Sequence, residues 1–274
     1  MTSQTSGSDL PPQAGGRLDV IGLGPGDAAL VTPATSAVVA DAEIFLGYGP
    51  YLDRLTLAPG QRREASDNRE ELDRAEAALR LAAEGRRVAV VSGGDPGVFA
   101  MAAAVCEAVE AGPAGWRQIE IAVHPGITAA LAVAARAGAP LGHDFCVISL
   151  SDNLKPWSLV EARLKAAAEA GFAMALYNPI SRARPWQLGA AFEALGSVLP
   201  ADVPVIFGRA LSRPGERLSV SRIAEATAAA EAFGADMATL VIVGSRETRV
   251  IARPGRPPLV YSPRSVTTAR EAAS

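Results

Sequence analysis

The stretch "VAVVSGGDPGVFAMAAAV", from Val88 to Val105, decides the fold class of this chain. It begins with a short apolar run typical of a buried strand. It then turns through two glycines, an aspartate and a proline, and continues as an Ala-rich segment typical of a helix. Glycines let the main chain approach another group closely, and backbone N–H groups at the start of a helix bind polar or anionic ligands. The stretch therefore predicts a strand, turn and helix unit whose turn binds a ligand.

Two other stretches follow the same plan. "RLDVIGLGPGD" (17–27) precedes a helix-like segment, and "IEIAVHPGITAALAVAARAGAPL" (119–141) contains its own strand, Pro-Gly turn and Ala-rich helix. Strands that alternate with helices predict a parallel sheet covered by helices, and ligands bind such sheets at the carboxyl ends of the strands. The turns at Gly22, Gly93 and Pro125 all fall on that edge.

The second half of the chain has a different pattern. Apolar runs at 172–179, 203–211 and 237–245 predict strands, and "GERLSVSRIAEA" (215–226) predicts a strand that turns back before a helix, so we expect a mixed sheet there. The predicted fold class is α/β, with two α/β domains. The expected parts are a flexible tail at 1–16, an N-terminal domain at 17–142, a C-terminal domain at 143–252 and a C-terminal tail rich in Pro, Arg and Ser at 253–274.

Composition excludes some partners. The chain has 274 residues, with 26 Lys and Arg against 29 Asp and Glu, a formal net charge of -3. We therefore expect no nucleic-acid partner, and no membrane partner because no apolar run reaches the ~20 residues that a bilayer crossing needs. Cys106 and Cys146 lie in apolar segments and are expected to be buried free thiols of a cytoplasmic protein. His124 and His143 have no Cys, Asp or second His at ligand spacing, so no metal site is predicted.

The individual turns leave alternatives open. "GLGPGD" (22–27) resembles the dinucleotide fingerprint G-x-G-x-x-G, but Asp27 stands where the third glycine belongs, and no acidic residue follows the next strand to hold a ribose. The other interpretation of this stretch is a tight structural turn. In "SGGDPGVF" (92–99), Asp95 either accepts hydrogen bonds from a ribose hydroxyl or ammonium group of a ligand, or only caps the helix that follows.

Five motifs taken together give a more specific indication. "GLGPGD", "SGGDPGVF", "HPGITAA", "ALYNP" and "MATLVIVG", in this order, resemble the tetrapyrrole (corrin/porphyrin) methylases. The resemblance implies two α/β domains, with S-adenosylmethionine as cofactor in the cleft between them and S-adenosylhomocysteine as its product. The cofactor contacts that the resemblance implies are Pro25, Gly93, Gly94, Asp95, Val98, Thr128, Ala129, Tyr177, Asn178, Ala210, Leu211, Thr239 and Leu240.

Two further stretches are similar to one branch of this family. "ISLSDNLKPW" (148–157) and "LYNPISRARPWQL" (176–188) resemble the branch that methylates precorrin-3B at C17 and contracts the ring in cobalamin biosynthesis. Ring contraction moves protons and opens a lactone, so a general acid or base would assist it. The candidates are Asp152 and Lys155, with Ser151 as a hydrogen-bond partner. The alternative is that Asp152 only caps a turn.

The substrate of such an enzyme carries many carboxylates, which arginines bind well. For each arginine the alternative is a solvent-exposed position without a ligand. The candidates are Arg62, Arg63, Arg69, Arg182 and Arg184.

Several functions stay open on the sequence alone. Within methyl transfer, the substrate could be methylated at another ring carbon, could already contain cobalt, or could be rRNA ribose or a protein. Outside it, the alternatives are a nicotinamide-dependent oxidoreductase and a non-catalytic carrier of the tetrapyrrole. The family resemblance also implies a homodimer.

Overall fold

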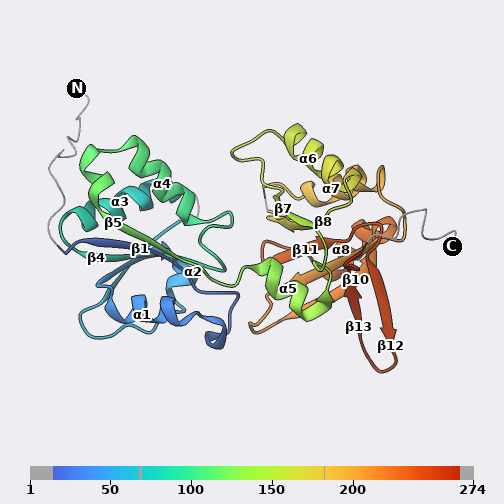
Figure 1. Cartoon of the computed structure of the whole chain (residues 1–274), viewed down its shortest axis with the longest axis horizontal. Helices are drawn as coiled ribbons and strands as arrows, with labels where there is room; N and C mark the ends of the chain where they lie inside the picture. Colours follow the sequence, from blue (N-terminus) through green and yellow to red (C-terminus); the bar gives the residue numbers. More distant parts are fainter. Residues whose placement is uncertain (1–14, 68–69, 182, 266–274) are drawn as a thin grey trace. The chain divides into compact units, whose positions relative to one another are not determined.

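The structure is a computed structural model that describes residues 15–67, 70–181 and 183–265. These residues form two compact units, both visible in Figure 1. Each unit is built around its own five-stranded sheet, with helices on both faces. No helix in the described ranges is long and apolar enough to cross a membrane.

The first unit ends at Thr128 and the second begins at Ala129. From the sequence, the boundary was expected near Gly142. The structure divides the chain earlier because α5 (Ala129–Ala137), the helix that follows the third turn, buries its small apolar side chains against the sheet of the second unit.

The sheet of the first unit is entirely parallel, in the order β3-β2-β4-β1-β5. This confirms the parallel sheet expected from the alternating strands and helices. Gly22 lies opposite Ser92, and Ile21 lies opposite His124, so the strand ends that precede the three turns are neighbours. The strands are β1 (Arg17–Gly22), β2 (Ile44–Tyr48), β3 (Arg62–Ser66), β4 (Arg87–Ser92) and β5 (Glu120–His124).

Both faces of this sheet are apolar, as expected for strands buried between helices. One face packs against α1 and α2, and the other packs against α3 and α4 (Figure 1). The helices are α1 (Pro33–Asp41), α2 (Gly49–Leu52), α3 (Glu71–Ala83) and α4 (Met101–Ala111), with the short 3-10 helices η1 (Ala28–Leu30) and η2 (Ala114–Gln118).

Helix α4 begins later than the sequence indicated. The proline at 96 suggested a helix directly after the glycine turn, but the first helical residue is Met101. Phe99 has a φ of 51°, in the left-handed region that a helix cannot contain, and this keeps the segment before Met101 out of the helix. The turn is therefore longer than expected.

The sheet of the second unit has the order β10-β9-β11-β8-β7. It is mixed, which confirms the mixed sheet expected for the second half of the chain. Only β7 and β8 run parallel, and β10 turns back along β9 as the sequence predicted. The strands are β7 (Phe145–Ser149), β8 (Ala173–Tyr177), β9 (Pro204–Arg209), β10 (Arg217–Arg222) and β11 (Thr239–Val243).

Three helices cover one face of this sheet, and α5 lies against the other face (Figure 1). The side chains of β8 show the division, because Leu176 packs with the three helices and Ala175 packs with α5. The three helices are α6 (Trp157–Glu169), α7 (Gln187–Gly196) and α8 (Ala226–Phe233), which follows the 3-10 helix η3 (Ile223–Glu225).

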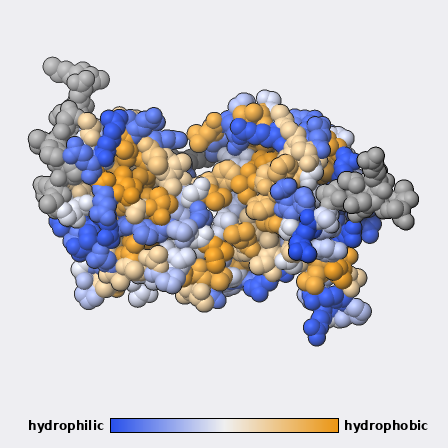
Figure 2. Space-filling model, viewed as in Figure 1, coloured by the Kyte–Doolittle hydropathy of each residue, from blue (hydrophilic) through white to orange (hydrophobic). Residues whose placement is uncertain are grey.

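A hairpin stands where the sequence indicated the start of a tail. Strands β12 (Arg249–Arg253) and β13 (Arg256–Tyr261) pair with each other, and β13 also pairs with the short strand β6 (Gly138–Ala139). Val260 is completely buried. On the face shown in Figure 2 the tip of the hairpin is hydrophilic, as its Pro- and Arg-rich composition suggested, but its base is part of the second unit.

The same Leu→Ala change should have opposite outcomes at two positions in the second unit. Leu164 on α6 is 0% exposed and Leu154 is 95% exposed. We expect Leu164→Ala to lower the free energy of unfolding by about 2–5 kcal/mol, because it opens a cavity in the core. Leu154→Ala should change it by less than about 0.5 kcal/mol. Urea unfolding followed by circular dichroism measures both, and equal losses would contradict the description of this core.

Candidate functional site

The three turns at the carboxyl edge of the first sheet are joined directly to one another. Gly24 and Gly94 exchange main-chain hydrogen bonds, with N to O distances of 3.1 and 3.0 Å. The main-chain N–H of Gly126 donates to Oδ2 of Asp95 at 3.0 Å. One continuous structure therefore contains the first, second and third turns.

Close main-chain packing explains why these turns contain glycine. A Cβ atom on Gly126 would lie 2.2 Å from the carbonyl oxygen of Gly94, and one on Gly22 would lie 2.5 Å from the same oxygen. No side chain fits at either position. The glycines are thus required by contact between the turns, a reason that the sequence interpretation, with its emphasis on ligand approach, did not include.

Asp95 links two turns. Its Oδ1 accepts from the N–H of Gly97 at 2.8 Å, which closes the second turn, and its Oδ2 accepts from Gly126 in the third turn. The structure does not show Asp95 as the cap of the following helix, because α4 begins at Met101 and its N-cap is Ala100, without a side-chain cap hydrogen bond. It does not remove the ligand interpretation, because each carboxylate oxygen can accept more than one hydrogen bond.

The predicted cofactor residues of the first unit gather around this junction. Pro25 lies between two glycines of the first turn, Val98 follows Asp95 in the second, and Thr128 ends the third. All three are half-buried. The structure thus brings together, at one sheet edge, the first-unit residues that the sequence singled out.

In the second unit, the predicted residues lie around one end of the sheet. The hydroxyl of Tyr177, at the end of β8, accepts from the N–H of Ala130 in the first turn of α5 at 2.9 Å. Asn178 and Ala210 have φ values of 53° and 51°, a left-handed conformation that costs non-glycine residues energy and is concentrated at functional sites. Leu211 and Leu240 belong to the core between the sheet and α5, so Leu240 has little side chain available for a ligand.

Thr239 has a structural role. Its hydroxyl donates to Oδ1 of Asp236 at 3.1 Å and accepts from the N–H of Asp236 at 3.0 Å. Oδ2 of Asp236 accepts two hydrogen bonds from the Arg209 guanidinium, at 2.7 and 3.0 Å. Partial burial acts to raise the pKa of Asp236, but the bonds from Arg209, Ala238 and Thr239 outweigh it and lower the pKa.

The predicted acid and base residues lie in the loop between β7 and α6. Oδ1 of Asp152 accepts from Nη1 of Arg184 at 2.5 Å and from Nε2 of Gln187 at 2.8 Å. Gln187, which the sequence analysis missed, is 2% exposed at the first position of α7. Its only sequence signal is a polar residue where the helix pattern predicts a buried position. These two partners hold Asp152 in place beside α7.

Lys155 is better suited to proton transfer. Its ammonium group donates to the carbonyl oxygen of Ser151 at 2.8 Å. Burial lowers the pKa of Lys155, nearby Arg163 lowers it further, and Asp152 partly opposes both. Lys155 therefore loses its proton at a lower pH than an ordinary lysine does.

The comparison with known families agrees with this geometry. The family model of the tetrapyrrole (corrin/porphyrin) methylases matches residues 17–227, a span that contains all three turns.

The chain belongs to the tetrapyrrole (corrin/porphyrin) methylases.

Similar proteins cover almost the whole methylase chain. A protein of Sinorhizobium sp named precorrin-3B C(17)-methyltransferase is 66% identical, over 91% of this chain and 96% of that protein. The solved structure of the methyltransferase CobJ is 50% identical with a TM-score of 0.84, covering 90% of this chain and 100% of that chain. A uroporphyrin-III C-methyltransferase of Thermus thermophilus, complexed with S-adenosyl homocysteine, has a TM-score of 0.64 over 84% of this chain and 97% of that chain. At 23% identity it shows a common fold only.

The arginines predicted to bind the substrate of this methylase lie on different elements, and those in the described residues have partners within the protein. Arg62 lies at the amino end of β3, the edge opposite the three turns, and pairs with Glu64 at 3.0 Å, which argues against a substrate role. Arg63 donates to the carbonyl oxygen of Leu55, and Arg184 is paired with Asp152. The two remaining candidates, Arg69 and Arg182, lie outside the described residues.

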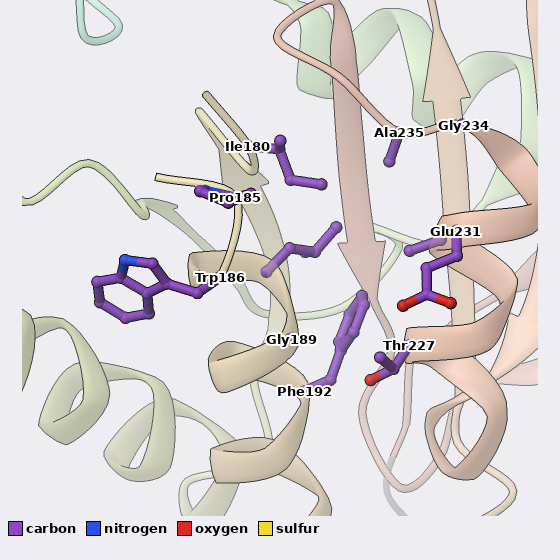
Figure 3. Close-up of a pocket in the computed structure, with 11 residues that line it drawn as sticks. Ile180, Pro185, Trp186, Gly189, Phe192, Thr227, Glu231, Gly234 and Ala235 are labelled. Carbon is purple, nitrogen blue, oxygen red and sulfur yellow. The ribbon is translucent and has the colours of Figure 1, made fainter. Parts of the chain in front are cut away.

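One pocket of about 370 Å³ lies in the second unit, between α7 and α8. Figure 3 shows Phe192 of α7 and Thr227 and Glu231 of α8 facing this space. Its residues pack on the face of the sheet covered by α6 to α8, whereas Tyr177 packs toward α5. The pocket is therefore separate from the predicted cofactor residues of this unit.

In the described part of the chain, no group of three or more His, Cys, Asp or Glu side chains is placed to hold a metal ion.

Cys106 is exposed on α4 and Cys146 is half-buried on edge strand β7, so the expectation of two buried thiols was wrong. Both helix α4 and the edge strand have a solvent-facing side that an apolar sequence run does not reveal.

The pKa of Asp236 gives a prediction for stability. Because its folded-state pKa lies below the ordinary value, the ionised carboxylate stabilises the fold at neutral pH, and this contribution is lost as the pH falls through the folded-state pKa. Asp236→Asn should lower the unfolding free energy by no more than about 1 kcal/mol at pH 7, since solvent screens a partly exposed pair. The difference from the wild type should shrink below about pH 4. Urea unfolding at several pH values measures it, and a difference that grows in acid would contradict this assignment.

Proposed function

We propose that this chain transfers a methyl group from S-adenosylmethionine to C17 of precorrin-3B and contracts the macrocycle to precorrin-4, in cobalamin biosynthesis. The observation that carries the proposal is the junction of three small-residue turns at the ligand edge of the first sheet, in a chain of the tetrapyrrole methylase family. The choice of precorrin-3B and C17 is supported by the name of the 66% identical relative and by the stretches at 148–157 and 176–188.

The residues of the first unit fit this cofactor. When bound, S-adenosylmethionine supplies an electrophilic methyl group. The carboxylate of Asp95 has spare lone pairs for a ribose hydroxyl or an ammonium group, and the turns carry no bulky side chains at the junction. We propose that Pro25, Gly93, Gly94, Asp95, Val98 and Thr128 bind it in this unit.

In the second unit, the proposed contacts rest on the family resemblance and on two strained positions. Asn178 and Ala210 keep left-handed backbones at strand ends, and strain of this kind persists where a site requires it. The hydroxyl of Tyr177 bonds to Ala130, and that of Thr239 bonds to Asp236. We propose that these two residues position the main chain around the cofactor. The proposed second-unit residues are Ala129, Tyr177, Asn178, Ala210, Leu211, Thr239 and Leu240.

Positioning accounts for most of the catalysis in this proposal. Methyl transfer from a sulfonium is an in-line displacement, and correct orientation of two bound reactants is worth effective molarities of about 10⁵–10⁸ M. Turns joined by main-chain hydrogen bonds suit this task because they hold a ligand without side-chain motion. Ring contraction needs proton transfer in addition. We assign this to Lys155, with Asp152 and Ser151 holding its loop.

We also propose that the protein acts as a cytoplasmic homodimer, as the family resemblance implied. Support comes from the edge strand β7, where Phe145 and Val147 are 41% and 40% exposed. Alternate residues of a strand face the same side, so these two side chains form one apolar surface on a strand at the edge of its sheet, and edge strands are where a second chain can pair.

Binding of the two candidate cofactors tests the class of enzyme. Calorimetric titration should show micromolar affinity for S-adenosylhomocysteine and none for NADH. Asp95→Ala should weaken the first affinity by at least about 10-fold, because two turns lose their link.

Asp73→Ala is the matched control, since this carboxylate is exposed on α3 of the same unit, and it should bind like the wild type. NADH binding alone would replace the proposal by the oxidoreductase. Binding of S-adenosylhomocysteine without methylation of precorrin-3B would redirect it to another ring carbon or to the cobalt-containing substrate.

The lowered pKa of Lys155 gives a test of the second chemical step. In the wild type, ring contraction should accelerate with rising pH as Lys155 loses its proton, below the pH of about 10.4 at which an ordinary lysine titrates. Lys155→Met should slow contraction by about 10²-fold or more and leave S-adenosylhomocysteine affinity unchanged. Product analysis by mass spectrometry and NMR across a pH series measures both.

Lys165→Met is a suitable comparison, because Lys165 lies on α6 and pairs with Glu161 one turn earlier on the same helix. It should retain the wild-type rate at every pH. If contraction in Lys155→Met kept the wild-type rate and pH profile, the assignment of Lys155 would be wrong.

A further inference from the structure

Arg54, which is not part of any of the three turns, forms hydrogen bonds to the first glycine turn. It follows the short helix α2, and its guanidinium donates to three carbonyl oxygens of that turn. Nη1 donates to Gly24 at 3.1 Å, and Nη2 donates to Leu23 at 2.5 Å and to Gly26 at 3.3 Å. Two of these carbonyls flank Pro25, a proposed cofactor contact.

These hydrogen bonds complete the main-chain pairing of the turn. The N–H groups of Leu23 and Gly24 donate to the carbonyls of Ser92, at the end of β4, and Gly94, in the second turn. The carbonyl of Gly24 also accepts from the N–H of Gly94, so Arg54 is its second partner. The guanidinium also supplies a partner for the carbonyls of Leu23 and Gly26, and unpaired main-chain groups away from water are costly. A planar guanidinium with five donors can satisfy several carbonyls at once, and hydrogen bonds from a charged donor are the stronger kind.

The same segment supports the second turn. Tyr51, three residues before Arg54, lies so close to Gly93 that a Cβ atom on this glycine would be 2.7 Å from Cε1 of the ring. The short segment from Tyr51 to Arg54 thus contacts the first turn through a guanidinium and the second through an aromatic ring.

The loop that carries Arg54 is fixed in turn by a second arginine. Arg63 on β3 donates to the carbonyl oxygen of Leu55, the residue after Arg54, and its Nη1 lies 3.6 Å from a carboxylate oxygen of Asp53. Arg63, which the sequence suggested for substrate binding, therefore holds the residues on both sides of Arg54.

From this arrangement we propose that Arg54 is a positioning residue of the cofactor site. Its guanidinium fixes the carbonyls of the first turn, and so holds Pro25 in register with Gly94 of the second turn. The inference rests on the proposed function, because it assumes that S-adenosylmethionine binds at this junction. Arg54 acts through the main chain, so the affinities for S-adenosylmethionine and for its uncharged-sulfur product should depend on it equally.

The test is S-adenosylhomocysteine affinity in three folded variants. Arg54→Met keeps most of the side-chain volume and removes all three bonds, and we expect about 10- to 100-fold weaker binding, the loss typical of small displacements in a site. Arg54→Lys should fall between this variant and the wild type, because an ammonium reaches fewer carbonyls. Arg80→Met is the matched control, since Arg80 is exposed on α3 and pairs with Glu76, and it should bind normally.

Two further measurements separate positioning from general destabilisation. Hydrogen exchange should accelerate at the amides of Leu23 and Gly24 in Arg54→Met while the second unit keeps its protection. With precorrin-3B, KM for S-adenosylmethionine should rise more than kcat falls. Should Arg54→Met fail to fold, Arg54→Lys and Arg63→Met supply the same comparison, with Arg63→Met expected to weaken binding less than Arg54→Met.

The outcomes are distinguishable. If the wild type does not bind S-adenosylhomocysteine, the proposed function fails and this inference fails with it. If the wild type binds and Arg54→Met binds equally well, the inference alone is overturned. A loss in Arg54→Met with no recovery in Arg54→Lys and with lower protection throughout the protein would also overturn it, because the residue would then serve only stability.

Discussion

The main-chain contact between Gly24 and Gly94 is the constraint on which the candidate site depends. Two strands that are neighbours in a parallel sheet end side by side, and their turns continue the pairing beyond the sheet. This contact brings the main chains of the two turns so close together that no side chain fits between them, and glycine is therefore needed around it. Asp95 then adds the third turn through Gly126. Residues from three distant parts of the sequence thereby form one rigid surface at the edge where α/β sheets bind ligands.

The sequence predicted this arrangement well because the signals were local and repeated. Each turn follows a short apolar strand, and three such units in one sheet can only place their turns on the same edge. The mixed second sheet was also predictable, since the run 215–226 follows its predecessor too closely for a helical crossover. What local patterns could not reveal was the reason for the glycines. They are needed for contact between turns, and such a contact appears only once the strand order is known.

Long-range hydrogen bonds account for most of what the sequence did not predict. Arg184 and Gln187 are more than thirty residues from Asp152, and nothing in the intervening sequence marks them as its partners. Their bonds change the expected roles, since Asp152 becomes a holder of the loop and Lys155 the proton-transfer candidate. Arg54 was overlooked for the same reason. An arginine after a short helix has no distinctive pattern, and its partners are carbonyl oxygens, which every residue has.

The pairing of β13 with β6 has a consequence for synthesis of the protein. Gly138 lies opposite Val260, so the strand that completes this part of the second unit is made long after its partner. The first unit contains all of its own strands and can fold while the ribosome is still translating the second. The core beside α5, in contrast, stays open until Val260 has left the exit tunnel. The second unit is thus completed late in translation, when the three joined turns of the first unit have already formed.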